Sequence, residues 1–300
     1  MKSKFIVKRD YHNTRFDRWF KHNVSDLPQS LIEKLIRKNK IKVNKKKTKT
    51  KYRVQSNDEI EIFNFENIKH KNKSEIKKYK PSNKETNTYS NFIIEDNNNF
   101  VVINKPAGIP VQSGTKSFKN IIDIIKNTKY FNNSKPYIVH RLDKETSGVM
   151  IVAKNREYAQ LFTSLFRIRK IYKIYLAITH GEVKNDINLL EDNLILYEKN
   201  KKIIQKAISH LKILKKSNNY SFLELKPITG RKHQLRKQLY NIGNSIVGDD
   251  KYSSHERIKE FKGKKLMLHS YKIKFMINNV KYNFEAKYDE EFKNFIKKKL

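Results

Sequence analysis

The sequence has no cysteine in its 300 residues. Without thiols the chain cannot form disulfides, use a thiolate nucleophile or build a zinc site from cysteine ligands, and it suits a reducing compartment. None of the nine histidines belongs to an H-E-x-x-H run, so that type of zinc-hydrolase site is also excluded. Gly243 and Gly248 lack a following Lys-Ser/Thr pair, which excludes a nucleotide-binding P-loop.

Long apolar runs are missing as well. No segment approaches the ~20 apolar residues of a membrane-spanning helix, and the apolar part of the basic N-terminus is too short for a secretory signal. Hydrophobic residues still make up 37% of the chain, which is enough for the packed core of one large or two smaller domains. We therefore expect a soluble, cytoplasmic protein that does not bind membranes.

Acidic residues are scarce relative to basic ones. There are 30 Asp and Glu against 66 Lys and Arg, and the formal net charge is +36. A field of this size attracts polyanions such as nucleic acids. The chain is also crowded with Asn and Ile, however, and an AT-rich genome would favour Lys, Asn and Ile codons without selection for binding. Charge alone therefore leaves both explanations open.

A first, basic domain is predicted over residues 1–75. Phe16, Trp19 and Phe20 recur at helical spacing and predict an amphipathic helix, in which Trp19 packs in the core rather than stacking on a base. Residues 30–33, with the pattern Ser-x-x-Glu, match a capping box, so a second helix is predicted to begin at the serine.

A small sheet is predicted to follow these two helices. A strand at 41–43, a basic turn at 44–47 and an alternating strand at 59–62 complete a unit that resembles the S4 RNA-binding domain. The alternative is a small basic helical cap. Basic side chains on an outer face can reach phosphates without reading sequence. The candidates for such RNA contacts are Lys34, Arg37, Lys38, Lys40, Lys45 and Lys46.

Residues 76–90 are polar and without periodicity, and they are predicted to form a flexible linker. Residues 91–300 are predicted to form the second domain. Its patterns predict helices over residues 117–126 and 156–166 and strands over residues 91–94, 100–103 and 169–177. They also predict two strands that pair with each other, over residues 207–214 and 221–226. Residues 185–202 are too weakly patterned to assign.

The most informative stretch is His140–Gly148, which reads HRLDKETSG and stands between the apolar runs 137–139 and 149–153. This predicts an irregular turn held between two buried strands, where catalytic groups tend to sit. Taken alone, Asp143 and Arg141 would be a turn-stabilising pair. The nine residues together resemble the HRLDxxTSG signature of the pseudouridine synthases of the RluA superfamily.

Four further segments match motifs of this family in the family's order. They are Lys105–Val111 with KPxGxxV, Lys173–Ala177 with KxYxA, Thr229–Arg236 with TGRxHQLR and Gly248–Tyr252 with GDxxY. A helix is predicted to run from Arg231 to Gly243 with Thr229 as its cap. Arg231, at this predicted helix start, is a further candidate for RNA contact.

The resemblance implies an α+β protein in which an S4-like domain precedes a catalytic domain with a mixed, mostly antiparallel sheet. It also implies that uridine in RNA is isomerised to pseudouridine without a metal or a small-molecule cofactor. Asp143 would be the catalytic carboxylate, Tyr175 would stack on the base, and Arg236 would pair with Asp143 and keep it ionised. Arg141 would fill the space left by the extruded uridine and contact phosphate, and His140 would support the turn.

The S4-like domain favours large-subunit (23S) ribosomal RNA as the partner, and we expect a monomer. Two alternatives remain open. One is a pseudouridine synthase that acts on transfer RNA, and the other is a ribosomal RNA-binding assembly factor without catalytic activity. The presence of Asp143, Tyr175 and Arg236 together argues against the second, because a pure binding protein has no need of all three.

Overall fold

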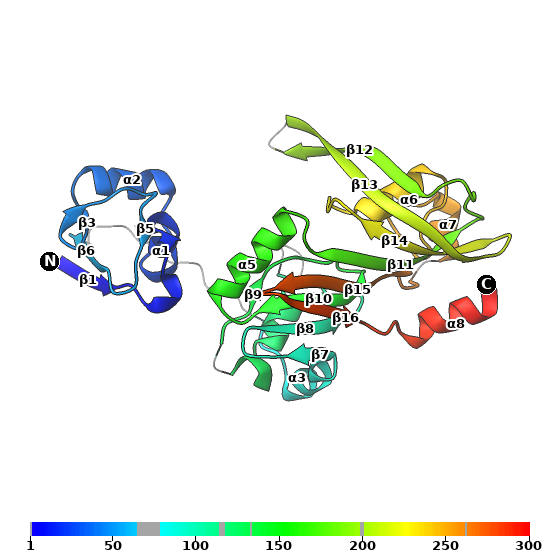
Figure 1. The fold of residues 1–300 in the computed structure, drawn as a ribbon, viewed down its shortest axis with the longest axis horizontal. Helices are drawn as coiled ribbons and strands as arrows, with labels where there is room; N and C mark the ends of the chain where they lie inside the picture. The colour runs from blue at the N-terminus through cyan, green and yellow to red at the C-terminus, as the bar shows by residue number, and fades with distance from the viewer. Residues whose placement is uncertain (1, 65–78, 114–117, 133, 199–200, 262) are drawn as a thin grey trace. The chain divides into compact units, whose positions relative to one another are not determined.

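The computed structural model describes residues 2–64, 79–113, 118–132, 134–198, 201–261 and 263–300. The chain divides into two compact units, Met1–Lys78 and Tyr79–Leu300 (Figure 1). Over the described ranges, none of the helices combines the length and the hydropathy of a membrane span.

The first unit combines two helices with a small antiparallel sheet. The sheet has the strand order β1-β6-β3-β4, and β2 and β5 form a separate pair. The elements are β1 (Lys2–Ile6), the 3-10 turn η1 (Arg9–Tyr11), β2 (Thr14–Arg15), α1 (Phe16–Asn23), α2 (Gln29–Arg37), β3 (Ile41–Val43), β4 (Lys46–Lys47), β5 (Arg53–Val54) and β6 (Glu59–Phe63).

The helices and strands predicted for this unit are present, with one correction at the second helix. Trp19 is buried, so it is a core residue as predicted. Helix α2 begins at Gln29, one residue earlier than predicted, and its N-cap Pro28 makes no side-chain capping bond. Glu33 accepts a hydrogen bond from the Gln29 amide at 3.3 Å rather than closing a capping box with Ser30. Pro28 already fixes the backbone dihedral φ where the helix begins.

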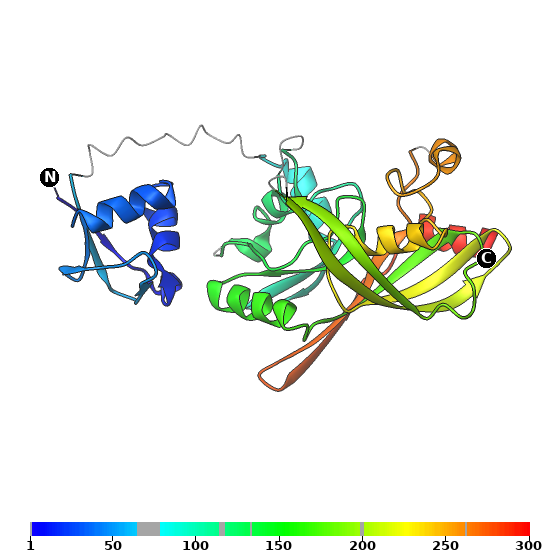
Figure 2. The same cartoon turned by 90° about the horizontal axis from the view of Figure 1, so that it is seen from above.

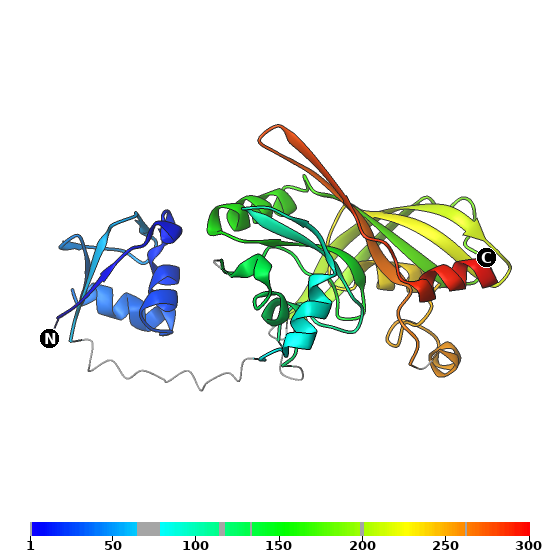
Figure 3. The ribbon, with the colours of Figure 1, turned by 90° about the horizontal axis from the view of Figure 1, so that it is seen from below.

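The second unit is built on one mixed sheet, which confirms the predicted fold class. Its strand order is β12-β13-β14-β11-β15-β10-β8-β7, with β16 beside β15 and β9 beside β10. Only the β10–β15 pair among these is parallel. The β15–β16 hairpin extends beyond the neighbouring strands (Figure 3). The strands are β7 (Ile93–Asp96), β8 (Phe100–Lys105), β9 (Tyr137–Ile138), β10 (Ser147–Ala153), β11 (Tyr172–His180), β12 (Leu189–Glu198), β13 (Lys201–Lys216), β14 (Tyr220–Pro227), β15 (Leu268–Ile277) and β16 (Val280–Glu285).

Helices cover both faces of this sheet. Successive side chains of a strand point to opposite faces, and on β8 Phe100 packs with α5 whereas its neighbour Val101 packs with α4. Helices α4 and α5 therefore lie on opposite faces, while α6 and α8 pack on β11, β13 and β14 (Figure 2). The helical elements are α3 (Asn83–Ser90), α4 (Ile121–Ile125), the 3-10 turn η3 (Lys129–Phe131), α5 (Arg156–Arg167), α6 (Gln234–Asn241), α7 (His255–Glu260) and α8 (Glu290–Lys299).

Part of the segment predicted as a linker is helical. Residues 83–90 form α3, and Ser82 and Glu85 make a capping box at its start. The segment lacks an apolar stripe, so periodicity did not predict this helix, although its Ser-x-x-Glu cap was visible in the sequence. Residues 76–78 of the predicted linker lie outside the described residues.

In two other segments of the second unit the structure differs from the predicted ranges. The helix predicted over residues 117–126 is confined to α4 with Asn120 as its N-cap, and Phe118 is exposed instead of facing the core. The unassigned segment 185–202 contains β12, which pairs with β13 along its whole length. Strands 207–214 and 221–226 were predicted to pair, and the β13–β14 pairing confirms this.

The parallel contact between β10 and β15 fixes the end of the HRLDKETSG stretch. Ser147 and Gly148 pair there with His269 and Ser270, and Ser147 Oγ lies 2.9 Å from His269 Nδ1. Gly148 has a φ of 110°, and a Cβ at this position would overlap the backbone carbonyl of Ser270. Only glycine fits both conditions, so the loop that carries Asp143 is held tightly against β15.

Candidate active site

Asp143 stands in the loop between β9 and β10. Leu142 is buried and packs in the apolar cluster of β8, β10 and α4, whereas Arg141 before it is exposed and Asp143 after it is half-buried. The Thr146 N–H donates to the Asp143 carbonyl oxygen at 3.2 Å and closes the turn. Leu142 therefore anchors the loop, and the two charged side chains beside it remain accessible.

His140 supports this loop from the protein interior. The backbone N–H of Ile151 donates to His140 Nε2 at 2.9 Å, and the ring stacks on Phe166 with centroids 4.5 Å apart. Burial lowers the pKa of His140 to about 3, so the ring is neutral at physiological pH. A ring nitrogen already occupied by a backbone donor fits the expected supporting role.

Lys105, in the KPxGxxV segment, is a buried lysine whose side chain links two loops. Its Nζ donates to the carbonyl oxygens of Pro106, Ile109 and Lys144 at 2.8, 2.9 and 3.1 Å. Burial lowers the pKa of Lys105 to about 7. The segment therefore holds the backbone directly after Asp143 in place.

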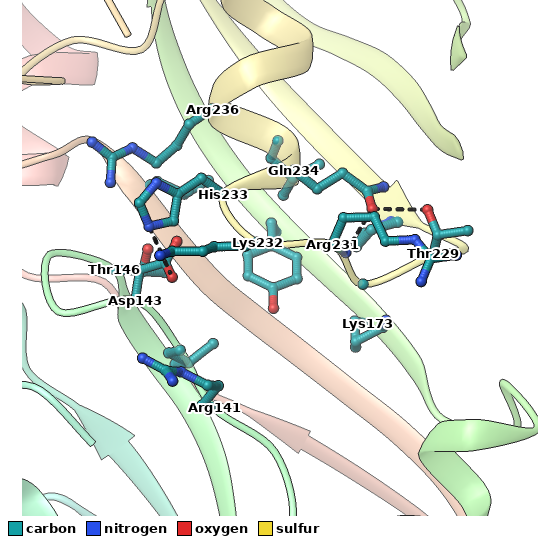
Figure 4. Close-up of a pocket in the computed structure, with 16 residues that line it drawn as sticks. Arg141, Asp143, Thr146, Lys173, Thr229, Arg231, Lys232, His233, Gln234 and Arg236 are labelled. Atoms are coloured by element: carbon teal, nitrogen blue, oxygen red, sulfur yellow. Dashed lines mark hydrogen bonds and ion pairs between the residues drawn. The ribbon is translucent and has the colours of Figure 1, made fainter. Parts of the chain in front are cut away.

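The Asp143 loop and the segment before α6 border an open cavity of about 350 Å³. Figure 4 shows Arg141 and Asp143 on one side of it and the residues from Thr229 to Arg236 on the other. Five Lys or Arg residues line the cavity, and Asp143 carries the one carboxylate among the described lining residues. In the described parts of the chain, no three His, Asp or Glu side chains gather as a metal site requires. The lining residues are Arg141, Leu142, Asp143, Thr146, Lys173, Tyr175, Pro227, Thr229, Gly230, Arg231, Lys232, His233, Gln234, Leu235, Arg236 and Leu268.

Tyr175 reaches the cavity from β11. The register of β11 against β15 shifts between Ile174 and Tyr175, and the Tyr175 ring packs against two apolar clusters. Burial, with a smaller effect from Asp143, raises the pKa of Tyr175 to about 12, so its hydroxyl stays protonated. Tyr172, the other tyrosine of this strand, is 64% exposed and is not among the lining residues.

Arg236 lines the cavity but does not pair with Asp143, so that prediction was wrong. Its Nε and Nη2 donate to the two carboxylate oxygens of buried Asp249, both at 2.7 Å, and Nη2 lies 3.3 Å from exposed Asp250. Asp249 offers both oxygens to the planar guanidinium, which is the geometry that arginine favours. Burial alone would raise the pKa of Asp249, but the hydrogen bonds from Arg236 hold it below its usual value.

The side chain that faces the Asp143 carboxylate is His233. Its Nε2 lies 3.6 Å from Asp143 Oδ1 (Figure 4), and its Nδ1 lies 3.0 Å from the Tyr252 hydroxyl. Burial lowers the pKa of His233, and Asp143 partly opposes this effect. The sequence places His233 and Tyr252 in family motifs but does not indicate a role for either, because spacing does not reveal that the Tyr252 segment folds back onto His233.

Helix α6 begins at Gln234 rather than at Arg231, and Thr229 is not its cap. The Thr229 hydroxyl accepts the Ile208 N–H at 2.8 Å and donates to Gln234 Oε1 at 2.8 Å. The Arg231 side chain donates from Nε to the Lys206 carbonyl oxygen at 3.1 Å. Hydrogen bonds to β13 therefore take the place of a helix cap and leave Arg231 at the cavity wall.

The predicted phosphate contacts of the first unit lie on its surface. Asn44 and Lys45 have φ values of 48° and 63°, as in a two-residue hairpin turn, and this turn presents Lys45 and Lys46 outward. Lys40 is half-buried, and the other five candidates are exposed. Their contact with RNA stays a prediction. The six are Lys34, Arg37, Lys38, Lys40, Lys45 and Lys46.

Comparisons with known proteins give a consistent result. The RNA pseudouridylate synthase family model matches residues 99–241, and the S4 domain model matches residues 27–60. A Rickettsia felis protein named ribosomal large subunit pseudouridine synthase C is 34% identical over 260 residues, which cover 81% of this chain and 83% of that protein. A protein of the same name from Buchnera aphidicola subsp. Baizongia pistaciae is 31% identical over 305 residues, which cover 97% of this chain and 95% of that protein.

A solved structure shows the same fold. Human RNA Pseudouridylate Synthase Domain Containing 4 superposes with a TM-score of 0.62 at 25% identity, covering 71% of this chain and 94% of that chain. The matched family region includes both the Asp143 loop and the segment that opens α6. The chain therefore belongs to the RNA pseudouridylate synthase family and carries an S4 domain in its first unit.

Proposed function

We propose that this protein converts uridines of large-subunit ribosomal RNA into pseudouridine, with Asp143 as the catalytic carboxylate. The observation that carries the proposal is the cavity in which Asp143 is the one carboxylate among five Lys and Arg residues. Its volume of about 350 Å³ suits one extruded nucleotide, and its charge suits a polyanion. A glycosidase that works with two carboxylates would need a second one in the same cavity.

The reaction is an isomerisation. The bond between C1′ of the ribose and N1 of the uracil breaks, the uracil turns within the cavity, and C5 bonds to C1′. The proton on C5 leaves to solvent and N1 takes up a proton, so the product has the same atoms as the substrate. One ionised carboxylate can act at the sugar carbon as nucleophile or as an electrostatic and proton-transfer partner, and this is the role of Asp143. Atoms balance without an external reactant, so the proposal includes no cofactor.

Other cavity residues hold the nucleotide. The Tyr175 ring packs against two apolar clusters and also lines the cavity, so it offers a surface on which the uracil can stack beside C5. Extruding a stacked uridine costs a few kcal/mol. Arg141 is exposed beside Asp143, where it can occupy the vacated space, and Arg231 on the opposite wall can contact phosphate. Arg236 does not pair with Asp143 and supports the site indirectly, through the residues that it contacts.

The S4 domain and the names of the related proteins support ribosomal rather than transfer RNA. A second RNA-binding unit raises the local concentration of the catalytic unit along a very large RNA. All the lining residues that the structure describes come from one chain. We include in the proposal that the protein acts as a monomer, in the cytoplasm where ribosomal RNA is processed.

The test is a pseudouridine map of total RNA from a strain that lacks the gene and from the same strain complemented with it. The proposal predicts that one or a few pseudouridines disappear from large-subunit ribosomal RNA and return on complementation. Loss confined to transfer RNA would contradict the assignment to ribosomal RNA but would still support pseudouridine formation as the reaction. No loss in any RNA would favour the non-catalytic assembly factor.

A further inference from the structure

His233 adopts a strained backbone conformation at the edge of the cavity. It has φ 53° and ψ 31°, in the left-handed region, as the residue that precedes helix α6. This conformation is unfavourable for a residue with a side chain, and such strain tends to occur where a side chain has to be aimed. In His233 the result is a ring with Nε2 directed at Asp143 and Nδ1 directed at Tyr252.

The two neighbours of the ring decide which nitrogen carries its proton. An ionised Asp143 offers only acceptors, so Nε2 has to carry the hydrogen for this contact to be favourable. Nδ1 is then an acceptor, and the Tyr252 hydroxyl, at 3.0 Å, is the donor that it needs. Burial lowers the pKa of His233 and raises that of Tyr252, so the ring is neutral and the phenol keeps its hydrogen at physiological pH.

We propose that His233 and Tyr252 are positioning residues for the proposed reaction, in which Tyr252 fixes the His233 tautomer and His233 holds one oxygen of Asp143. The distance of 3.6 Å between Nε2 and Oδ1 is longer than a hydrogen bond. Such contacts often shorten only when substrate binds. A donor to one oxygen sets the rotation of the carboxylate and leaves the other oxygen for C1′ of the ribose.

Tyr252 is itself held in place by the Arg236–Asp249 pair. Asp249 Oδ1 accepts the backbone N–H groups of Lys251 and Tyr252 at 2.9 and 2.8 Å. The Arg236 guanidinium lies over the Tyr252 ring, 5.2 Å from its centroid, within the range of a cation–π contact. Arg236 therefore influences Asp143 through Tyr252 and His233 rather than through an ion pair of its own.

The kinetic test uses three variants of His233. They separate the effect of its hydrogen-bond donor from the effects of its size and of its left-handed backbone conformation. In His233→Gln the amide nitrogen can reach the place of Nε2, whereas His233→Met fills similar space without a donor. His233→Asn tolerates the left-handed backbone but is too short to reach Asp143. Single-turnover release of tritium from large-subunit ribosomal RNA transcribed with [5-³H]uridine measures the rate, since the C5 hydrogen leaves in the reaction.

We expect the rate of His233→Gln to stay within about tenfold of wild type and the rates of the Met and Asn variants to fall on the order of 10²-fold, with RNA affinity unchanged. Equal rates for the Gln and Met variants, with wild type active, would overturn the positioning role. The inference rests on the proposed function. An inactive wild-type protein would instead count against that function.

A second measurement tests the geometry without any reaction. Nitrogen chemical shifts of ¹⁵N-histidine in the full-length protein report which ring nitrogen carries hydrogen. The inference predicts the Nε2–H tautomer for His233 in wild type and a mixture of both tautomers in Tyr252→Phe. The control Tyr240→Phe removes an exposed hydroxyl from helix α6 and should leave the spectrum unchanged. An Nδ1–H tautomer in wild type, or no change in Tyr252→Phe, would contradict the proposal.

Discussion

Asp143 faces a histidine, and the arginine expected beside it is bonded elsewhere. A guanidinium in a bidentate bond to Asp143 would occupy both carboxylate oxygens and leave neither for C1′ of the ribose, whereas a single N–H donor from His233 occupies one. Asp249 keeps Arg236 in a buried pair in which the two side chains are 0% and 5% exposed. The pairing of Arg236 with Asp249 therefore leaves the Asp143 carboxylate free of an arginine partner.

Arg236→Ala should unfold more easily than wild type as well as lose activity. Removing one partner of a buried ion pair leaves Asp249 charged and unpaired, which costs about 3–5 kcal/mol. Urea unfolding at neutral pH measures the loss. The double variant Arg236→Met/Asp249→Leu should recover only part of the stability, because it removes the unpaired charge but also the acceptor of the Lys251 and Tyr252 N–H groups. It should remain slow, because Tyr252 still lacks its support. An Arg236→Ala protein as stable as wild type would contradict the structural role.

The same pair makes stability depend on pH. The pKa of Asp249 is lower in the folded protein than its unfolded value of about 3.9. Its ionised form therefore stabilises the fold above pH ~4, and this contribution is lost as the pH falls through the folded value. Urea unfolding of wild type and Asp249→Asn should show a large difference at pH 7 that narrows below pH ~4. A difference that is constant with pH would refute the assignment.

At the scale of elements, Gly148 sets the distance between β10 and β15. Gly148→Ala should lose more than about 2 kcal/mol of unfolding free energy, since an alanine is strained at φ 110° and its Cβ meets the Ser270 carbonyl. Gly243→Ala is the matched control, because its φ is 83° and no atom lies within 4 Å of the added Cβ. Chemical denaturation measures the unfolding free energy of both variants, and the difference between them separates the cost of the contact with Ser270 from the cost of the positive φ. Equal losses would show that the close approach to Ser270 is not tight.

Elements with a strong apolar pattern were predictable, and those set by tertiary hydrogen bonds were not. The stripe of α1 and the β13–β14 pairing follow local periodicity, which a single sequence displays. Helix α6 starts later than predicted because Thr229 and Gln234 bond to β13, a strand that sequence spacing does not place beside them. The prediction that Arg236 pairs with Asp143 was wrong for the same reason, since Asp249 becomes the neighbour of Arg236 only after folding.

The net charge of +36 on the chain has two candidate origins, RNA binding and codon bias. Replacing Lys38, Lys45 and Lys46 with Gln removes three exposed charges from the S4 domain. The slope of log binding constant against log salt should then flatten by about 2–3 units, because each lost phosphate contact accounts for roughly 0.7–0.9.

A charge-matched control decides between these origins. Replacing Lys297, Lys298 and Lys299 with Gln removes the same charge from exposed positions near the end of α8. Filter binding to large-subunit ribosomal RNA over a range of salt compares the two variants. Equal changes in slope would mean that charge placement does not matter and would favour codon bias.

The substitution Asp143→Asn tests whether Asp143 carries out the isomerisation, because it preserves the shape of the side chain and removes only the carboxylate. Single-turnover tritium release from large-subunit ribosomal RNA transcribed with [5-³H]uridine is measured beside the wild type and the exposed control Asp186→Asn. We predict that Asp143→Asn binds this RNA with nearly wild-type affinity and releases no tritium above background, while Asp186→Asn reacts like wild type. Substantial tritium release by pure Asp143→Asn would contradict the claim.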